Sequence, residues 1–140
     1  MTMWQPGMAV SADRLNDGPP TIVEATGFTI ASGWDLNDFS MARAGSVVEL
    51  NLYVHRSGTT LTITGTANLN DTLVGTVPAE WCPTRGTING TWDDGTAEGG
   101  FVIGTDGIVT LRTSNGEAIV GDATSAGNGR NLRLHIVFIQ

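Results

Sequence analysis

Lysine is absent from this 140-residue sequence, and its seven basic residues are all arginine. Against 14 Asp and Glu residues, the arginines leave a formal net charge of -7 and a pI near 4.5. A protein with this charge repels the phosphates of nucleic acids and the anionic surface of lipid bilayers. No apolar run approaches the ~20 residues that a membrane-spanning helix needs. We therefore expect no nucleic-acid partner and no insertion into a membrane.

Cysteine is nearly absent as well, because Cys82 is the only one and cannot form a disulfide within the chain. Zinc needs several nitrogen or sulfur ligands at defined spacing, and a catalytic thiol needs a positioned base. Neither pattern surrounds Cys82, so a packing role is favoured. The two histidines, His55 and His135, fall in expected strands, where packing is favoured over catalysis or metal binding. The sequence predicts no metal site and no cofactor.

Catalytic motifs are also missing. No GxSxG nucleophile elbow occurs, and no glycine-rich phosphate loop stands between a strand and a helix. The acidic residues around Asp94 lack the ligand register of a calcium-binding loop, so a plain turn is favoured there. Nothing marks a pair of converging carboxylates for glycoside cleavage near Asp38 or elsewhere. We expect that the chain is not an enzyme.

What the sequence has is alternation between apolar and polar residues, together with 19 glycines and many threonines. Residues 46–55 (SVVELNLYVH) alternate throughout. The expected inner face of this strand carries Val48, Leu50, Leu52 and Val54. About nine or ten such segments are separated by turns, with almost no helical pattern. This predicts an all-β fold, an antiparallel β-sandwich of jelly-roll type, with residues 21–140 as its head domain.

Further along, residues 59–66 are expected to form a strand and residues 68–71 a polar turn. The stretch 73–111 has the pattern of a β-meander, broken at Pro78 because proline lacks a ladder donor. The last segment, 131–140, becomes fully apolar toward its end. This predicts a strand buried on both faces, in the middle of a sheet or at a subunit contact.

Residues 1–20 differ from the rest and end in the linker sequence DGPP. A segment this short cannot bury its own apolar side chains. We therefore interpret it as an arm that docks on its own domain, a sister subunit or a larger assembly, rather than as a frayed terminus. The residues assigned to docking on a particle are Trp4, Pro6, Met8 and Leu15.

Three further tryptophans, Trp34, Trp81 and Trp92, are candidate contact residues. Aromatic side chains in loops stack on sugars and form contacts with other proteins. Packing in the core or at an interface explains the same residues equally well. The sequence leaves both alternatives open.

The order of features over residues 27–140 resembles the C-terminal knob domains of bacteriophage tail fibres and related virion appendages. Gly33-Trp34 is followed by Arg43, Gly45 and a V-x-L-x-L-x-V strand at 48–54. A turn ending in aromatic-x-Pro follows at 76–83 (TVPAEWCP), then I-x-x-D-G-x-V at 103–109 and an apolar terminal strand.

The opening residues 4–8 (WQPGM) with 14–16 (RLN) also look like the start of small structural proteins from phages of actinobacteria. Arginine in place of lysine agrees with the G- and C-rich genomes of such hosts. The resemblance implies a homotrimer on the virion, made in the host cytoplasm, that contacts other virion proteins and binds host-envelope glycans or reinforces a capsid.

Long fibres place shaft or coiled-coil sequence before the knob, and here an arm stands in its place. The resemblance therefore favours a short tail-fibre or receptor-binding appendage. A capsid decoration protein is the first alternative, and a free carbohydrate-binding module is a more distant one.

Overall fold

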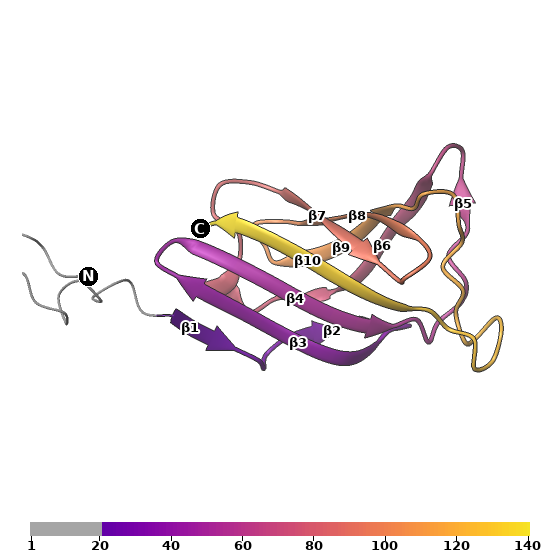
Figure 1. Ribbon diagram of the computed structural model, residues 1–140, viewed down its shortest axis with the longest axis horizontal. Helices are drawn as coiled ribbons and strands as arrows, with labels where there is room; N and C mark the ends of the chain where they lie inside the picture. The colour runs from indigo at the N-terminus through magenta and orange to yellow at the C-terminus, as the bar shows by residue number, and fades with distance from the viewer. Residues whose placement is uncertain (1–20) are drawn as a thin grey trace, which may run out of the picture.

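The computed structural model describes residues 21–140, which form an antiparallel all-β fold (Figure 1). A single turn of 3-10 helix, η1 (Ala79–Trp81), interrupts the strands. The strands are β1 (Thr21–Glu24), β2 (Thr29–Ile30), β3 (Asp35–Ala44), β4 (Val47–His55), β5 (Ile63–Thr64), β6 (Asn68–Thr76), β7 (Ile88–Asp93), β8 (Glu98–Ile103), β9 (Ile108–Thr113) and β10 (Asn131–Ile139). The predicted fold class is confirmed. The arm residues Trp4, Pro6, Met8 and Leu15 lie outside the described part of the chain.

All strands belong to one sheet in the order β1-β3-β4-β10-β7-β8-β9-β6-β2, with β5 paired to β6. In an open sheet of this order, the two edge strands would be separated by eight spacings of about 4.8 Å. The five links from Glu24 in β1 to Thr29 in β2 span at most about 18 Å. The sheet must therefore curl until its edges approach, which produces the two layers of a sandwich.

The core between the layers takes one side chain in two from each long strand. On β4 the buried residues are Val48, Leu50, Leu52 and Val54, as predicted. Trp92, Phe101 and Met41 are the largest of the fully buried side chains among the described residues. Residues from both layers form one continuous hydrophobic cluster.

Strand β10 lies in the middle of the sheet, between β4 and β7. This is one of the two positions that were predicted for it, the other being a subunit contact. The prediction that both of its faces are buried is wrong for the isolated chain. Its residues alternate strictly, and Val137 and Ile139 are 55% and 56% exposed. The apolar run therefore reflects an outer face that is itself apolar at this point.

Two local predictions are also wrong. Residues 68–71 are not a turn, because β6 begins at Asn68. The turn comes earlier, at residues 65–67, where Gly65 and Ala67 adopt positive φ values of 66° and 61°. For the same reason the strand predicted at 59–66 shrinks to Ile63–Thr64 and one isolated bridge from Leu61 to Ile119.

Candidate functional site

The outer face of the layer formed by β1, β3, β4 and β10 carries the candidate site. Residues directly opposite one another on paired strands share a face, so the registers define rows across this surface. Beginning at the β3–β4 hairpin, the rows are Thr21–Ala44–Val47–Ile139, Val23–Ala42–Glu49–Val137, Ser40–Asn51–His135, Asp38–Tyr53–Arg133 and Asp35–His55–Asn131. We call the hairpin side, where residue 21 and the C-terminus lie, the arm end, and the opposite side the far end (Figure 1).

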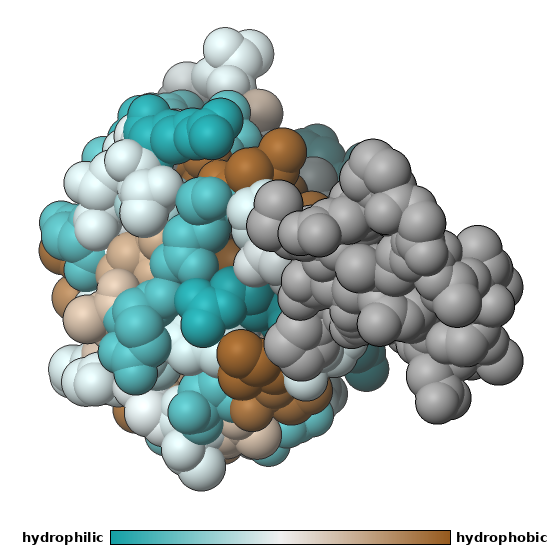
Figure 2. All heavy atoms as spheres, turned by 90° about the vertical axis from the view of Figure 1, so that its left-hand side faces the viewer, coloured by the Kyte–Doolittle hydropathy of each residue, from teal (hydrophilic) through white to brown (hydrophobic). Residues whose placement is uncertain are grey.

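The arm end of this face is apolar. Val23, Val47, Val137 and Ile139 are 65%, 47%, 55% and 56% exposed, and together we call them the apolar strip. Figure 2 views the molecule from this end and shows apolar surface between hydrophilic patches. Single exposed aliphatic side chains are ordinary, whereas a contiguous group such as Val47, Val137 and Ile139, at neighbouring positions on β4 and β10, marks a contact surface.

One polar pair lies beside Val137, in the second and third rows. Nε2 of His135 lies 2.9 Å from Oε1 of Glu49. The hydrogen bond from His135, with a smaller contribution from Asn51, holds the pKa of Glu49 below its ordinary value. The single carboxylate within the first two rows is therefore already partnered within its own chain.

Beyond this pair the face becomes a shallow polar groove of about 410 Å³. Its lining includes Asp38, Asn51, Tyr53, Arg133 and His135. The guanidinium of Arg133 stacks over the Tyr53 ring, 4.7 Å from the ring centroid. The groove thus combines the phenol ring of Tyr53 with amide, carboxylate, guanidinium and imidazole groups, an arrangement suited to a hydroxyl-rich ligand.

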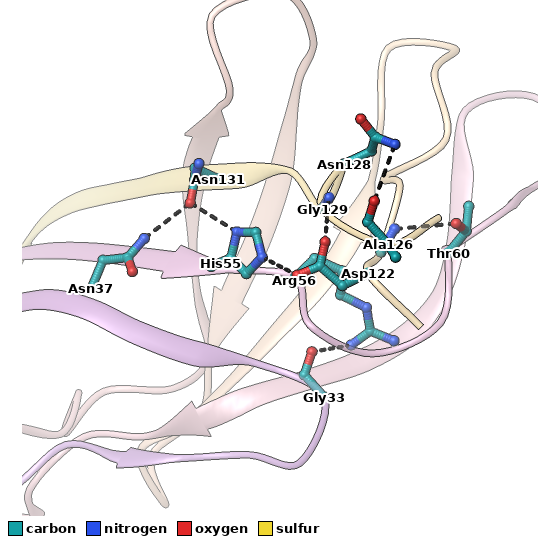
Figure 3. A network of polar contacts seen from close by, with 11 residues as sticks. Gly33, Asn37, His55, Arg56, Thr60, Asp122, Ala126, Asn128, Gly129 and Asn131 are labelled. Atoms are coloured by element: carbon teal, nitrogen blue, oxygen red, sulfur yellow. Dashed lines mark hydrogen bonds and ion pairs between the residues drawn. The ribbon is translucent and has the colours of Figure 1, made fainter. Parts of the chain in front are cut away.

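The far end is held by a network centred on His55 (Figure 3). Its Nε2 lies 2.7 Å from Asp122, and its Nδ1 lies 3.0 Å from Oδ1 of Asn131. The same Asn131 oxygen accepts a hydrogen bond from Asn37, and Asp122 accepts one from the Gly129 amide. Both ring nitrogens therefore face acceptors, which favours the doubly protonated imidazolium.

The charges of this network follow from its geometry. The hydrogen bond to Asp122 raises the pKa of His55 above its ordinary value, more than partial burial lowers it. The bond from His55 and that from the Gly129 amide hold the pKa of Asp122 below its ordinary value. The pair ties the loop that carries Asp122 to the end of β4.

Next to the network lies Arg56, which is 7% exposed. Its guanidinium donates to the carbonyl oxygens of Thr59, at 2.9 Å, and Gly33, at 3.1 Å, and lies 4.8 Å from the centroid of the Trp34 ring. Burial lowers the pKa of Arg56. Backbone carbonyls and an aromatic face thus hold this cation within the fold.

The three candidate tryptophans are core residues. Trp34, Trp81 and Trp92 are 3%, 3% and 1% exposed, and they lie in different places: before β3, in η1 and in β7. The indole N–H groups of Trp34 and Trp92 donate to backbone carbonyls at 3.0 and 2.9 Å. Stacking on a sugar needs an open ring face, so the packing alternative applies to all three.

The turn that carries Trp81 is fixed at the arm end by the last residue of the sequence. The Gln140 side chain donates to the carbonyls of Glu80 and Cys82, at 2.7 and 3.1 Å. Arg43 donates to Oε1 of Gln140 at 2.9 Å and lies 4.9 Å from the Trp81 ring centroid. Burial raises the pKa of the Cys82 thiol, in keeping with a packing role.

The groove residues were missed by the sequence reasoning. The outward positions of β4, among them Tyr53, were visible in the alternation, and Arg133 lies in the predicted terminal strand. Their meeting in one row depends on the register of β10 against β4, which no local pattern records. A search of the outward positions for aromatic residues would have found Tyr53.

Within residues 21–140, no three His, Cys, Asp or Glu side chains are grouped closely enough to hold a metal ion. No helix in this part of the chain is long and apolar enough to cross a membrane. Every buried side-chain nitrogen or oxygen of these residues has a hydrogen-bond partner. No protein-family model and no curated protein matches the sequence.

Proposed function

We propose that this chain is a non-enzymatic structural protein of a bacteriophage particle. It forms a homotrimer, docks on the virion through residues 1–20 and acts as a short tail-fibre or receptor-binding appendage. The observation that carries the proposal is the division of one sheet face into an apolar strip next to residue 21 and a polar groove farther along the same strands.

The arm end supports the assembly part of the proposal. Thr21 stands in the same row as Val47 and Ile139, so the arm begins at the edge of the apolar strip. A protein that is assembled into a larger structure gains from apolar surface next to its attachment point, because burial of that surface contributes about 25 cal/mol per Å².

The groove supports the receptor-binding part. Tyr53 offers an aromatic ring on an outer face, surrounded by donors and acceptors that suit a glycan. Arg133 now stacks over that ring. Displacing an exposed cation from a ring costs about 0.5–1 kcal/mol, which a bound sugar can offset.

The assembly part is tested by locating the protein on a particle with an antibody against the head, and by adding back chains with and without residues 1–20. Incorporation that needs the arm is expected. A chain that never co-purifies with particles, or that joins them equally well without its arm, refutes docking through the arm.

The receptor part is tested by binding to host-envelope polysaccharide. Tyr53→Ala is expected to lower the affinity at least tenfold, whereas Arg112→Ala, an exposed arginine on β9 paired with Asp71, leaves it unchanged. High copy number on the capsid without host binding would favour the decoration role. A monomer that binds glycans without its arm would favour the carbohydrate-binding module.

A further inference from the structure

We infer that the apolar strip is the surface through which copies of this chain contact one another, strip against strip around the symmetry axis of the oligomer. The inference rests on the proposed function, which requires copies to associate but does not say where. The strip consists of Val23, Val47, Val137 and Ile139, all between 47% and 65% exposed in the isolated chain.

On this face of the sheet, charge favours the arm end over the far end for contact between identical copies. Each copy carries a net charge of -7, so most contacts between copies would bring carboxylates together. In the two rows of the strip, the single ionisable side chain is Glu49, which is hydrogen-bonded to His135 of its own chain. The far-end rows of the same face carry Asp35 and Asp38 instead. Contact through the arm end therefore brings fewer carboxylates together than contact through the far end.

The position of the strip within the sheet also defines the kind of contact. Val47 lies on β4, which is paired with β3 and with β10 along its length. Its backbone groups are used within the chain, so a second copy contacts Val47 through its side chain. Val47, Val137 and Ile139 are branched aliphatic side chains in adjacent rows and form the apolar part of this contact, whereas Glu49 lies beside Val137 with its carboxylate hydrogen-bonded to His135.

The start of the arm fits this arrangement. Thr21 lies in the first row of the strip, so copies that meet through the strip place residue 21 of every chain at one end of the assembly. Twenty residues precede this point in each copy. Arms gathered at one end can engage a single attachment site, while the grooves lie toward the other end of the same face.

The experiment compares substitutions inside and outside the strip by light scattering coupled to size exclusion, using the full chain. Val137→Glu is expected to lower the mass from a multiple of 14.7 kDa to that of one chain. The matched control is Leu73→Glu, because Leu73 is 48% exposed on β6 in the other layer. This control is expected to keep the wild-type mass. Circular dichroism identifies any variant that fails to fold.

A second comparison tests the strip without introducing a charged side chain into the proposed contact. The double variant Val47→Thr/Val137→Thr keeps both side-chain shapes and strand propensity, and it is expected to raise the concentration for half-association about tenfold. Val102→Thr, on β8 opposite Thr110, is the control and is expected to leave that concentration unchanged.

The other possible results distinguish between the strip as the contact surface, the trimer and the proposed function. An oligomer that survives both strip variants overturns the strip while leaving the proposed assembly intact. A dimer that both variants dissociate supports the strip and overturns the trimer. A wild-type chain that stays monomeric at about 100 μM overturns the strip and the trimer together. Arm-dependent incorporation into particles is measured independently and tests the proposed function itself.

Discussion

The arm end and the far end of the sandwich are built from the same strands, but different contacts hold the loops and turns at the two ends. Each contains an arginine stacked on a tryptophan: Arg43 on Trp81 at 4.9 Å, and Arg56 on Trp34 at 4.8 Å. Arg43 is only half-buried and bonds to the side chain of the terminal residue, Gln140. Arg56 is 7% exposed and bonds to backbone carbonyls.

The difference indicates which end is fixed by the fold and which end is left for contacts. At the far end, a buried cation and the His55 network join the ends of several loops, so this end is complete within the isolated chain. At the arm end, apolar side chains remain exposed, and the turn that carries Trp81 is held by the side chains of Arg43 and Gln140. We expect the far end to contribute more to stability and the arm end more to assembly.

The largest expected effect is on the far-end cation. Arg56→Met removes the donors to the carbonyls of Thr59 and Gly33 and should lower the free energy of unfolding by about 2–4 kcal/mol. Arg43→Met, at the arm end, should cost about 1 kcal/mol or less, because its stacking is partly exposed to solvent. Chemical denaturation of both variants measures the contrast. Equal losses in the free energy of unfolding would show that the two ends contribute equally to stability.

A smaller effect is expected at the arm-end turn. Gln140→Ala removes the donors to the carbonyls of Glu80 and Cys82, a loss of about 1 kcal/mol. Local opening of the turn should become about fivefold more frequent. The single thiol of the chain reports this directly, as the rate at which Cys82 reacts with a thiol reagent.

The control for the thiol measurement is Asn128→Ala. The side chain of Asn128 bonds to Ser125 and Ala126 within its own loop, away from the turn, so the variant should react at the wild-type rate. An unchanged rate in Gln140→Ala would show that the terminal side chain does not hold the turn closed.

Much of the fold was predictable because it depends on local signals. The alternation in residues 46–55 identifies both faces of β4, and Pro78 ends β6 at Thr76 because it cannot continue the ladder. The prediction of a turn at residues 68–71, which rests on their polar side chains, is wrong. They are polar because this part of β6 faces solvent, apart from the buried Leu69.

The candidate site was less predictable because it depends on register and burial. The exposed apolar pair Val137 and Ile139 reads in sequence like a buried run, since hydropathy alone does not say whether a second surface covers it. His55 and Asp122 are 67 residues apart, and only the fold brings them together. The sequence makes Trp81 a candidate contact residue because it lies within the turn at 76–83, but η1 places its ring beneath Arg43.

The smallest expected effect concerns the ion pairs of the two ends. The side chains of His55 and Asp122 are 22% and 31% exposed, against 51% and 45% for His135 and Glu49. Exposed pairs contribute little because solvent screens them. A double-mutant cycle with His55→Gln and Asp122→Asn at pH 5.5 should therefore give a larger coupling than one with His135→Gln and Glu49→Gln. Similar coupling energies would show that the difference in exposure between the two pairs does not change their contribution to stability.

The far-end coupling should also depend on pH in a defined direction. The pKa of His55 is raised on folding, with Asp122 the main cause and Asp35 a minor one, so its contribution is full below about 6.5 and is lost as the pH rises through the folded value. The pKa of Asp122 is lowered, so its contribution is present above about 3.9 and is lost as the pH falls. The coupling should be largest between about pH 4 and 6.5 and smaller at pH 8.5. Thermal melts of the four proteins of the cycle at pH 5.5 and 8.5 measure it, and a coupling that grows toward pH 8.5 would contradict a charged His55 as the link between β4 and its neighbouring loop.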